Sequence, residues 1–155
     1  MLDGSLQAQA ATSAPAPQGE AIRLLGLDFA NRPLAQVVAS LAARPADAPF
    51  AYVVTANSHQ LVRLSREADL RPLYEGAWMR LLGSRVVFKL CRMLALPAPA
   101  VISGYELSAH LFAQEIDRDE PVALLGLAPE AVAALKARTG LRRVDHHNPP
   151  TGFEN

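Results

Sequence analysis

The sequence predicts an α/β fold with a mostly parallel sheet, because strand-like apolar runs alternate with stretches of helical spacing. Residues 22–29 form the first such run. Residues 51–54 form a second run of apolar, aromatic and β-branched side chains, which is typical of a covered strand. Each run is followed by apolar residues spaced as on one face of a helix. This β-α-β-α order indicates parallel strands joined by helical crossovers.

Composition limits the classes of protein to which this chain can belong. Its 155 residues suffice for one domain with a core, and 50% hydrophobic against 19% charged residues is typical of a globular chain. The formal net charge of +0 gives no general attraction to nucleic acid, so no nucleic-acid partner is expected. The single cysteine, Cys91, excludes an internal disulfide and fits a reducing, cytoplasmic compartment.

Residues 1–20 are expected to form a flexible N-terminal tail, and residues 21–155 the α/β domain. The first segment is rich in Ala, Gln, Ser and Pro and lacks the basic start and apolar block of a secretory signal. The longest apolar stretch, residues 86–102, is interrupted by Lys89, Arg92 and two prolines. It is therefore not expected to span a membrane.

The first helix should begin just after Pro33 and end near Arg44, because Pro45 disfavours helical geometry in the residue before it. Further along, a helix should follow Ser103, a buried strand should cover residues 122–125, and a helix should run from Pro129 to a stop at Gly140. A last strand is expected at residues 141–145.

Polar residues directly after the second strand are the first candidates for a ligand site. Thr55, Asn57 and Ser58 are all good helix N-caps, and Leu61 and Leu64 continue at helical spacing. A helix should therefore begin at Asn57 or Ser58. Capping alone is the simplest interpretation. However, the carboxyl end of a parallel strand facing a helix N-terminus also binds phosphates and substrates, so both interpretations stay open.

Residues 76–105 contain no acidic residue but four basic ones, which gives this segment a local charge of +4. Arg85, Lys89 and Arg92 recur at i, i+4 and i+7 and would form one basic stripe on a helix. Apolar residues lie opposite this stripe: Val86, Val87, Leu90 and Leu94. The simplest interpretation is a solvated helix face. The alternative is attraction to phosphate, either of a ligand or of an anionic lipid surface.

No metal ion or other cofactor is expected. His146 and His147 are adjacent on a segment expected to be extended, so their side chains point to opposite sides, and no carboxylate follows at helical spacing. Cys91 is flanked by Leu90 and Arg92 in a predicted helix and has no obvious partner base. A buried structural thiol is therefore expected rather than a nucleophile.

Five segments, in their order and spacing from about residue 22 to the end, resemble motifs of the WecG/TagA/CpsF family of glycosyltransferases. They are Val54-Thr-Ala-Asn-Ser-His-Gln-Leu-Val, Asp69-Leu-Arg-Pro-Leu-Tyr-Glu, Ile102-Ser-Gly-Tyr-Glu-Leu, Val122-Ala-Leu-Leu-Gly-Leu and His147-Asn-Pro-Pro-Thr-Gly-Phe. The resemblance implies a Rossmann-like fold with helices on both faces of the sheet. It also implies transfer of a hexose or N-acetylhexosamine-type sugar from a UDP-sugar donor to a polyprenyl-diphosphate-linked acceptor. Such an enzyme would work in cell-surface polysaccharide synthesis, peripherally at the inner face of the membrane.

The resemblance also implies where the substrates bind. The strand-to-helix pattern itself places Thr55 and Asn57 at the carboxyl end of a central parallel strand, beside Gly104 across a cleft, because open α/β sheets bind ligands at that edge. The basic stripe would contact phosphate or the anionic membrane. Gly126 stands alone where the family usually has two glycines, and ordinary α/β packing explains it equally well. The implied substrate-binding positions are Thr55, Asn57, Gly83, Gly104, Glu106 and Gly126.

Two departures from the family bear on catalysis. Family members carry an Asp-Gly pair whose aspartate is regarded as the general base, and that pair aligns here, across a one-residue gap, with Leu82-Gly83. Leucine cannot take a proton, so the base is expected to be lost, with Glu75 and Glu106 the next candidates. The chain also ends where the family continues, so we expect the N-terminal, larger part of such an enzyme. Two alternatives remain: a divergent, non-catalytic member, or a nucleotide-binding module without transferase activity.

Overall fold

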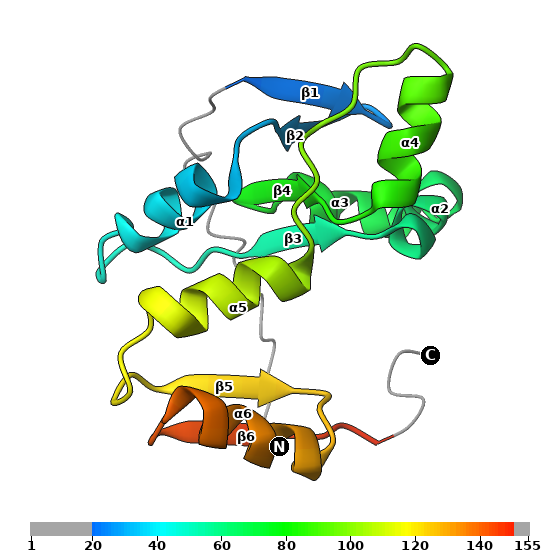
Figure 1. Cartoon of the computed structure of the whole chain (residues 1–155). Helices are drawn as coiled ribbons and strands as arrows, with labels where there is room; N and C mark the ends of the chain where they lie inside the picture. The colour runs from blue at the N-terminus through cyan, green and yellow to red at the C-terminus, as the bar shows by residue number, and fades with distance from the viewer. Residues whose placement is uncertain (1–19, 151–155) are drawn as a thin grey trace, which may run out of the picture. The chain divides into compact units, whose positions relative to one another are not determined.

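The computed structural model of the chain describes residues 20–150. The predicted tail therefore lies outside the described residues except for its last position, as does the end of the Pro-Pro-Thr-Gly-Phe loop. The chain divides into two compact units, Met1–Leu107 and Ser108–Asn155, which are described separately. Figure 1 shows the helices and strands of both units.

The described residues form a mixed α/β structure with three two-stranded sheets, which confirms the predicted class but makes the sheets small. The boundary between the units falls within α5. The first unit contains β1 (Ala21–Leu24), β2 (Leu27–Ala30), α1 (Leu34–Ala42), β3 (Val53–Ala56), α2 (Ser58–Arg66), the 3-10 helix η1 (Ala68–Leu70), α3 (Arg71–Glu75), β4 (Met79–Leu82), α4 (Arg85–Met93) and the start of α5 (Gly104–Gln114). The second contains the rest of α5, β5 (Val122–Leu125), α6 (Pro129–Thr139) and β6 (Val144–His147).

The predicted first strand at residues 22–29 is in fact a hairpin. β1 and β2 pair antiparallel, with Leu24 opposite Leu27, and a two-residue turn joins them. Both turn residues have positive φ, 51° at Leu25 and 75° at Gly26, as the favoured hairpin turns require. The turn was missed because Leu25 continues the apolar run, although it breaks the apolar-polar alternation that begins at Ile22 and is followed by Gly26, a residue that favours positive φ.

The central pair, β3 and β4, is parallel, with Thr55 opposite Leu81 and Ala56 opposite Leu82. β3 lies two residues later than the run predicted at 51–54. The strand β4 was not predicted, and it carries a basic residue, Arg80, in its middle. Arg80 is accommodated because its guanidinium donates to the Asp28 and Tyr74 carbonyls, both at 2.8 Å. Its charge therefore ties β4 to β2 and to the end of α3.

The hydrophobic core of the first unit lies between these strands and the helices α2 and α3. Leu82 on β4 is fully buried within it, and Val87 and Phe88 of α4 pack against it. Burial of this shared apolar surface holds the strands and helices of the unit together. The buried members are Leu27, Phe29, Ala56, Leu61, Leu64, Tyr74 and Leu82.

The helix predicted after Pro33 is confirmed, and Pro33 occupies its N-cap position. It buries Val37 and Val38 but ends at Ala42, slightly before the predicted end near Arg44. The Arg44 guanidinium instead lies over the Trp78 ring, 5.3 Å from its centroid. Arg44, which was expected near the end of the helix, thus lies outside it and contacts a residue distant in sequence.

In the second unit, β5 and β6 pair parallel, with Val122 opposite Val144. β5 and α6 lie where the sequence predicts them, and α6 stops at Gly140, whose φ of 72° is the left-handed conformation that glycine favours at this position. The last strand is Val144–His147 rather than residues 141–145. In the part of the chain that is described, no helix is both long and apolar enough to cross a bilayer.

Candidate functional site

Three helices begin at one edge of the parallel β3–β4 pair, where both strands have their carboxyl ends (Figure 1). α2 follows β3, and α4 follows β4. α5 follows Val101, which forms a parallel bridge with Leu82, and the next N–H group, that of Ile102, donates to the Leu82 carbonyl at 2.8 Å. Parallel pairing therefore gathers the N-termini of α2, α4 and α5 at the same edge.

The first of these helices, α2, begins with a capping box. Asn57 Oδ1 accepts a hydrogen bond from the Gln60 N–H at 2.9 Å, and Gln60 Oε1 accepts one from the Asn57 N–H, also at 2.9 Å. The expected helix start is confirmed. Capping engages the side-chain oxygen of Asn57. The side-chain nitrogen of this exposed residue remains available to a ligand.

We expect Asn57→Ala to lower the free energy of unfolding by about 1 kcal/mol, because it removes the cap from the Gln60 N–H group. Asn57→Asp keeps a capping oxygen and should cost less. Urea denaturation of the two variants and the wild type measures the difference. Equal losses in both variants would contradict a capping role for Asn57.

The second helix, α4, is capped by Ser84, whose Oγ accepts from the Val87 N–H at 3.2 Å. The preceding residue, Gly83, sits tightly against β3. Its N–H donates to the Ala56 carbonyl at 2.8 Å, and a Cβ at this position would lie 3.3 Å from the carbonyl oxygens of both Thr55 and Ala56. A glycine here lets the turn pass close to the neighbouring strand.

The third helix, α5, begins with a reciprocal pair between Ser103 and Glu106. Glu106 Oε2 accepts from the Ser103 N–H at 3.0 Å and from Ser103 Oγ at 2.8 Å, while Ser103 Oγ accepts from the Glu106 N–H at 3.2 Å. Glu106 Oε1 pairs with Arg85 of α4 at 3.1 Å. The hydrogen bonds from Ser103, aided by Arg85, hold the pKa of the Glu106 carboxyl below its usual value. Glu106 therefore ties two helix starts together and stays ionised at neutral pH.

Thr55 and Gly104 lie next to each other, as the sequence analysis placed them. A Cβ built on Gly104 would lie 2.9 Å from Thr55 Oγ1, so only glycine fits this position without movement. The two residues are thus nearly in contact, which corrects the expectation that a cleft separates them. The close packing fixes the start of α5 against the end of β3.

Leu82, which aligns with the aspartate of the family's Asp-Gly pair, is a buried residue. Its side chain is fully buried in the core of the first unit, and its neighbour across the parallel pair is Ala56. Leu82 is therefore a core residue at the last position of β4, and the place of the general base stays a prediction. Leu81 and Leu82 are both fully buried, so both faces of β4 are covered at this end, and the chain first reaches the edge at Gly83 and Ser84.

Gly126 lies in the other unit, in the turn after β5, with a φ of 76°. Its N–H already donates to the His147 carbonyl at 3.0 Å. A Cβ there would meet nothing within 4 Å. The pairing with β6 uses the N–H group that a phosphate cradle would need, so the structure gives Gly126 a structural role.

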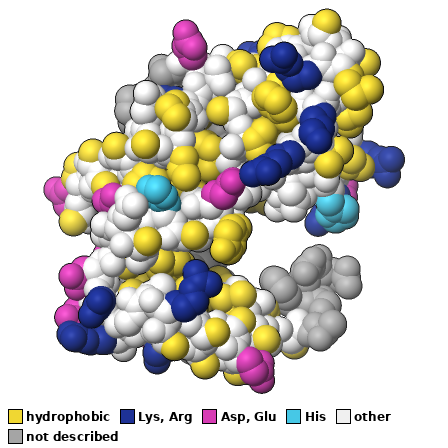
Figure 2. Space-filling view, in the orientation of Figure 1, with side chains coloured by type: hydrophobic (Ala, Val, Ile, Leu, Met, Phe, Trp, Pro, Cys, Tyr) yellow, Lys and Arg dark blue, Asp and Glu magenta, His cyan; other side chains and the backbone are white. Residues whose placement is uncertain are grey.

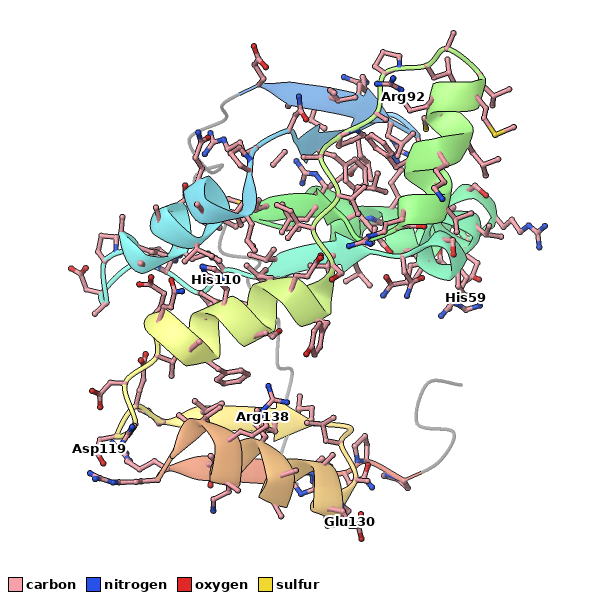
Figure 3. All side chains as sticks on the ribbon, viewed as in Figure 1. His59, Arg92, His110, Asp119, Glu130 and Arg138 are labelled. Carbon is pink, nitrogen blue, oxygen red and sulfur yellow. The ribbon has the colours of Figure 1, made fainter. Side chains whose placement is uncertain are left out.

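The basic stripe is confirmed as one face of α4, and its three side chains are exposed, but Val86 and Leu90, which were expected on the opposite face, are exposed beside it. Arg85 lies at the edge, where it pairs with Glu106, whereas Lys89 and Arg92 lie farther along the helix. Figure 3 shows Arg92 near the end of α4 and His59 projecting from the first turn of α2. Cys91 is buried, as expected.

Sequence reasoning missed three residues at this edge: Ser84, Ser103 and His59. Ser103 stands three residues before Glu106, the capping-box spacing that could have identified it, whereas Val87 takes the corresponding position after Ser84. No comparable signal marks His59. Within residues 20–150, no group of three His, Cys, Asp or Glu side chains is arranged to hold a metal ion.

The arrangement at this edge suits an anion. Each cap engages the N–H group of the third helical residue, and the first two N–H groups of a helix have no acceptor within it. Among residues 20–150, none of these groups in α2, α4 or α5 donates to another element. Such N–H groups and the positive ends of helix dipoles attract phosphate and carboxylate groups.

Comparison with known proteins identifies the family. A model of the family described as "Glycosyl transferase WecG/TagA/CpsF family" matches residues 22–155, which is most of the chain. No curated protein matches the chain significantly. The matched range contains every helix and nearly every strand residue described above, including the edge where the three helices begin. The chain therefore belongs to the WecG/TagA/CpsF family of glycosyl transferases.

Proposed function

We propose that this glycosyl transferase binds a UDP-sugar at the carboxyl edge of β3 and β4 and passes its hexose or N-acetylhexosamine-type sugar to a polyprenyl-diphosphate-linked acceptor. The product would serve cell-surface polysaccharide synthesis at the inner face of the membrane. The observation that carries the proposal is the gathering of three helix N-termini at one edge. Family membership supplies the reaction class.

In such a transfer, the acceptor hydroxyl attacks the anomeric carbon of the sugar. The bond from that carbon to the diphosphate oxygen breaks, UDP leaves with the electron pair, and the hydroxyl proton passes to a base. The departing diphosphate gains negative charge, which the N–H groups of α2, α4 and α5 are placed to stabilise without a metal ion. The Arg85 guanidinium lies at the same edge, where one of its nitrogens pairs with Glu106 and its other N–H groups remain to donate to the diphosphate.

A negative charge introduced at the carboxyl edge of β3 and β4 tests the proposed donor site. Asn57→Asp keeps the helix cap but adds a carboxylate beside the proposed diphosphate, so UDP-sugar affinity should fall by at least about tenfold through like-charge repulsion. Gln114→Glu is the matched control, because it adds one negative charge at the exposed far end of α5. Isothermal titration with UDP-glucose and UDP-N-acetylglucosamine measures both variants.

The nucleotide preference separates this proposal from a general nucleotide-binding module. We expect UDP-sugars to bind more tightly than ADP- or GDP-sugars. Equal affinity for all of them would favour the general module. An unchanged affinity in Asn57→Asp would place the diphosphate elsewhere.

A further inference from the structure

Helix α4 carries three stripes of side chains with different surroundings. Residues at i, i+4 and i+7 share one face of a helix, and a shift of one residue turns that face by about 100°. The basic stripe consists of Arg85, Lys89 and Arg92. The exposed apolar stripe consists of Val86, Leu90 and Met93, each one residue after a member of the basic stripe. The third stripe faces the protein.

The apolar stripe is exposed although the helix already has a packed face. Val87 and Phe88 pack on the core, and Cys91 is buried. By contrast, Val86 is 62% exposed, Leu90 50% and Met93 80%.

The chain beyond the helix extends this apolar surface. Leu94 is 67% exposed and Leu96 52%. Five large apolar side chains exposed on one helix and the three residues after it are uncommon on a soluble surface and indicate an interaction site. We call these five residues and the basic stripe the α4 surface.

The charges of the α4 surface point to one kind of partner. No acidic residue occurs between Glu75 and Glu106. Glu106 pairs with Arg85, but within residues 20–150 no carboxylate pairs with Lys89 or Arg92. Figure 2 shows a line of basic side chains along α4 with hydrophobic side chains beside it. The surface therefore offers apolar groups flanked by uncompensated positive charge.

A second copy of the chain fits this surface poorly. Two copies meeting through the same surface by twofold symmetry would bring their two basic stripes close together, where like charges repel. An anionic bilayer fits both parts. Its phosphates complement the basic stripe, and its acyl boundary receives the apolar stripe, as in helices that lie in the membrane interface.

We propose that the α4 surface docks the protein on an anionic lipid bilayer, with α4 lying along the interface. α4 starts at the edge where the donor is proposed to bind, so docking brings that edge near the bilayer surface. The further consequence, that a lipid-linked acceptor reaches the protein at this edge, rests on the proposed function. The docking itself does not.

Co-sedimentation of the full chain with vesicles tests the proposal. Without nucleotide, we expect binding to vesicles of phosphatidylglycerol and phosphatidylcholine, and much weaker binding to phosphatidylcholine alone. Lys89→Gln/Arg92→Gln should lower the partition coefficient on the anionic vesicles by about tenfold or more at low salt. The difference should shrink at high salt, because exposed charges are screened over about 10 Å at 0.1 M.

Matched variants separate this surface from general stickiness. Lys136→Gln/Arg138→Gln removes the same charge from exposed positions of α6 and should bind as the wild type does. Leu90→Gln/Met93→Gln should weaken binding at every salt concentration, because apolar burial is not screened. Leu125→Gln/Leu127→Gln, which alters two exposed leucines elsewhere, should not weaken it. Circular dichroism confirms that each variant is folded.

Three results would overturn the docking proposal. The first is absence of wild-type binding to the anionic vesicles. The second is that both α4 variants, while folded, bind the anionic vesicles as strongly as the wild type does. The third is a wild-type dimer that Leu90→Gln/Met93→Gln converts to a monomer in sedimentation analysis while vesicle binding is unchanged, which would assign the surface to a second copy. UDP-sugar titration without vesicles tests the donor site separately, so the two proposals can fail independently.

Discussion

Replacing Leu82 with aspartate is expected to unfold the protein rather than to supply a general base. The Leu82 side chain is fully buried among the core residues of the first unit. Removing a buried leucine typically costs about 2–5 kcal/mol, and an unpaired carboxylate in the same place adds a further penalty. We therefore expect the free energy of unfolding to fall by at least about 4 kcal/mol. Because whole domains are stable by only about 5–15 kcal/mol, a loss of this size is enough to unfold a typical domain.

Urea denaturation followed by the fluorescence of Trp78, which is buried in the same unit, measures this loss. Leu82→Met is the matched control and should cost less than about 1.5 kcal/mol, because it keeps the volume and the apolar character. A folded Leu82→Asp protein with a midpoint near that of the wild type would mean that residue 82 reaches solvent. Sugar transfer gained by that variant would then identify position 82 as the base position.

Sugar transfer by this chain is expected to be about 10²- to 10⁴-fold slower than by a family member that carries the Asp-Gly pair, because general-base assistance typically contributes that factor. The aspartate position aligns with Leu82 or the adjoining gap, and neither Leu82 nor Gly83 can accept a proton. Transfer from a panel of UDP-sugars to a lipid-diphosphate acceptor analogue, compared between the two proteins, measures the deficit.

Glu106 is the carboxylate that the structure places at the proposed site, and it is poorly suited to act as the base. Three hydrogen-bond donors, two from Ser103 and one from Arg85, stabilise its ionised form. The lowered pKa makes Glu106 a weaker base, so Glu106→Gln should lower the residual rate by much less than the factor of about 10² that loss of a general base costs, and that smaller effect comes from the lost Arg85 pair. The other candidate, Glu75, is paired with Arg71 at the end of α3. Rapid transfer that Glu106→Gln abolishes would instead make Glu106 the base.

Local sequence determined much of this protein. The start of α1 after Pro33, the Asn57 cap of α2 and the stop of α6 at Gly140 are all confirmed. Each depends on backbone geometry or hydrogen bonds within about four residues, which the sequence displays directly. The alternation of strands and helices gave the α/β class for the same reason, since periodicity is a local property.

Only the tertiary structure decided how these elements are used. The basic Arg80 lies in a strand because carbonyls from β2 and α3 receive its guanidinium, and Leu82 faces the core because β4 pairs with β3. The same packing joins Arg85 to Glu106 across 21 residues and leaves Leu90 of an apolar stripe in solvent. These outcomes depend on contacts between segments distant in sequence, and no local pattern reports which face of a helix or strand such contacts will cover.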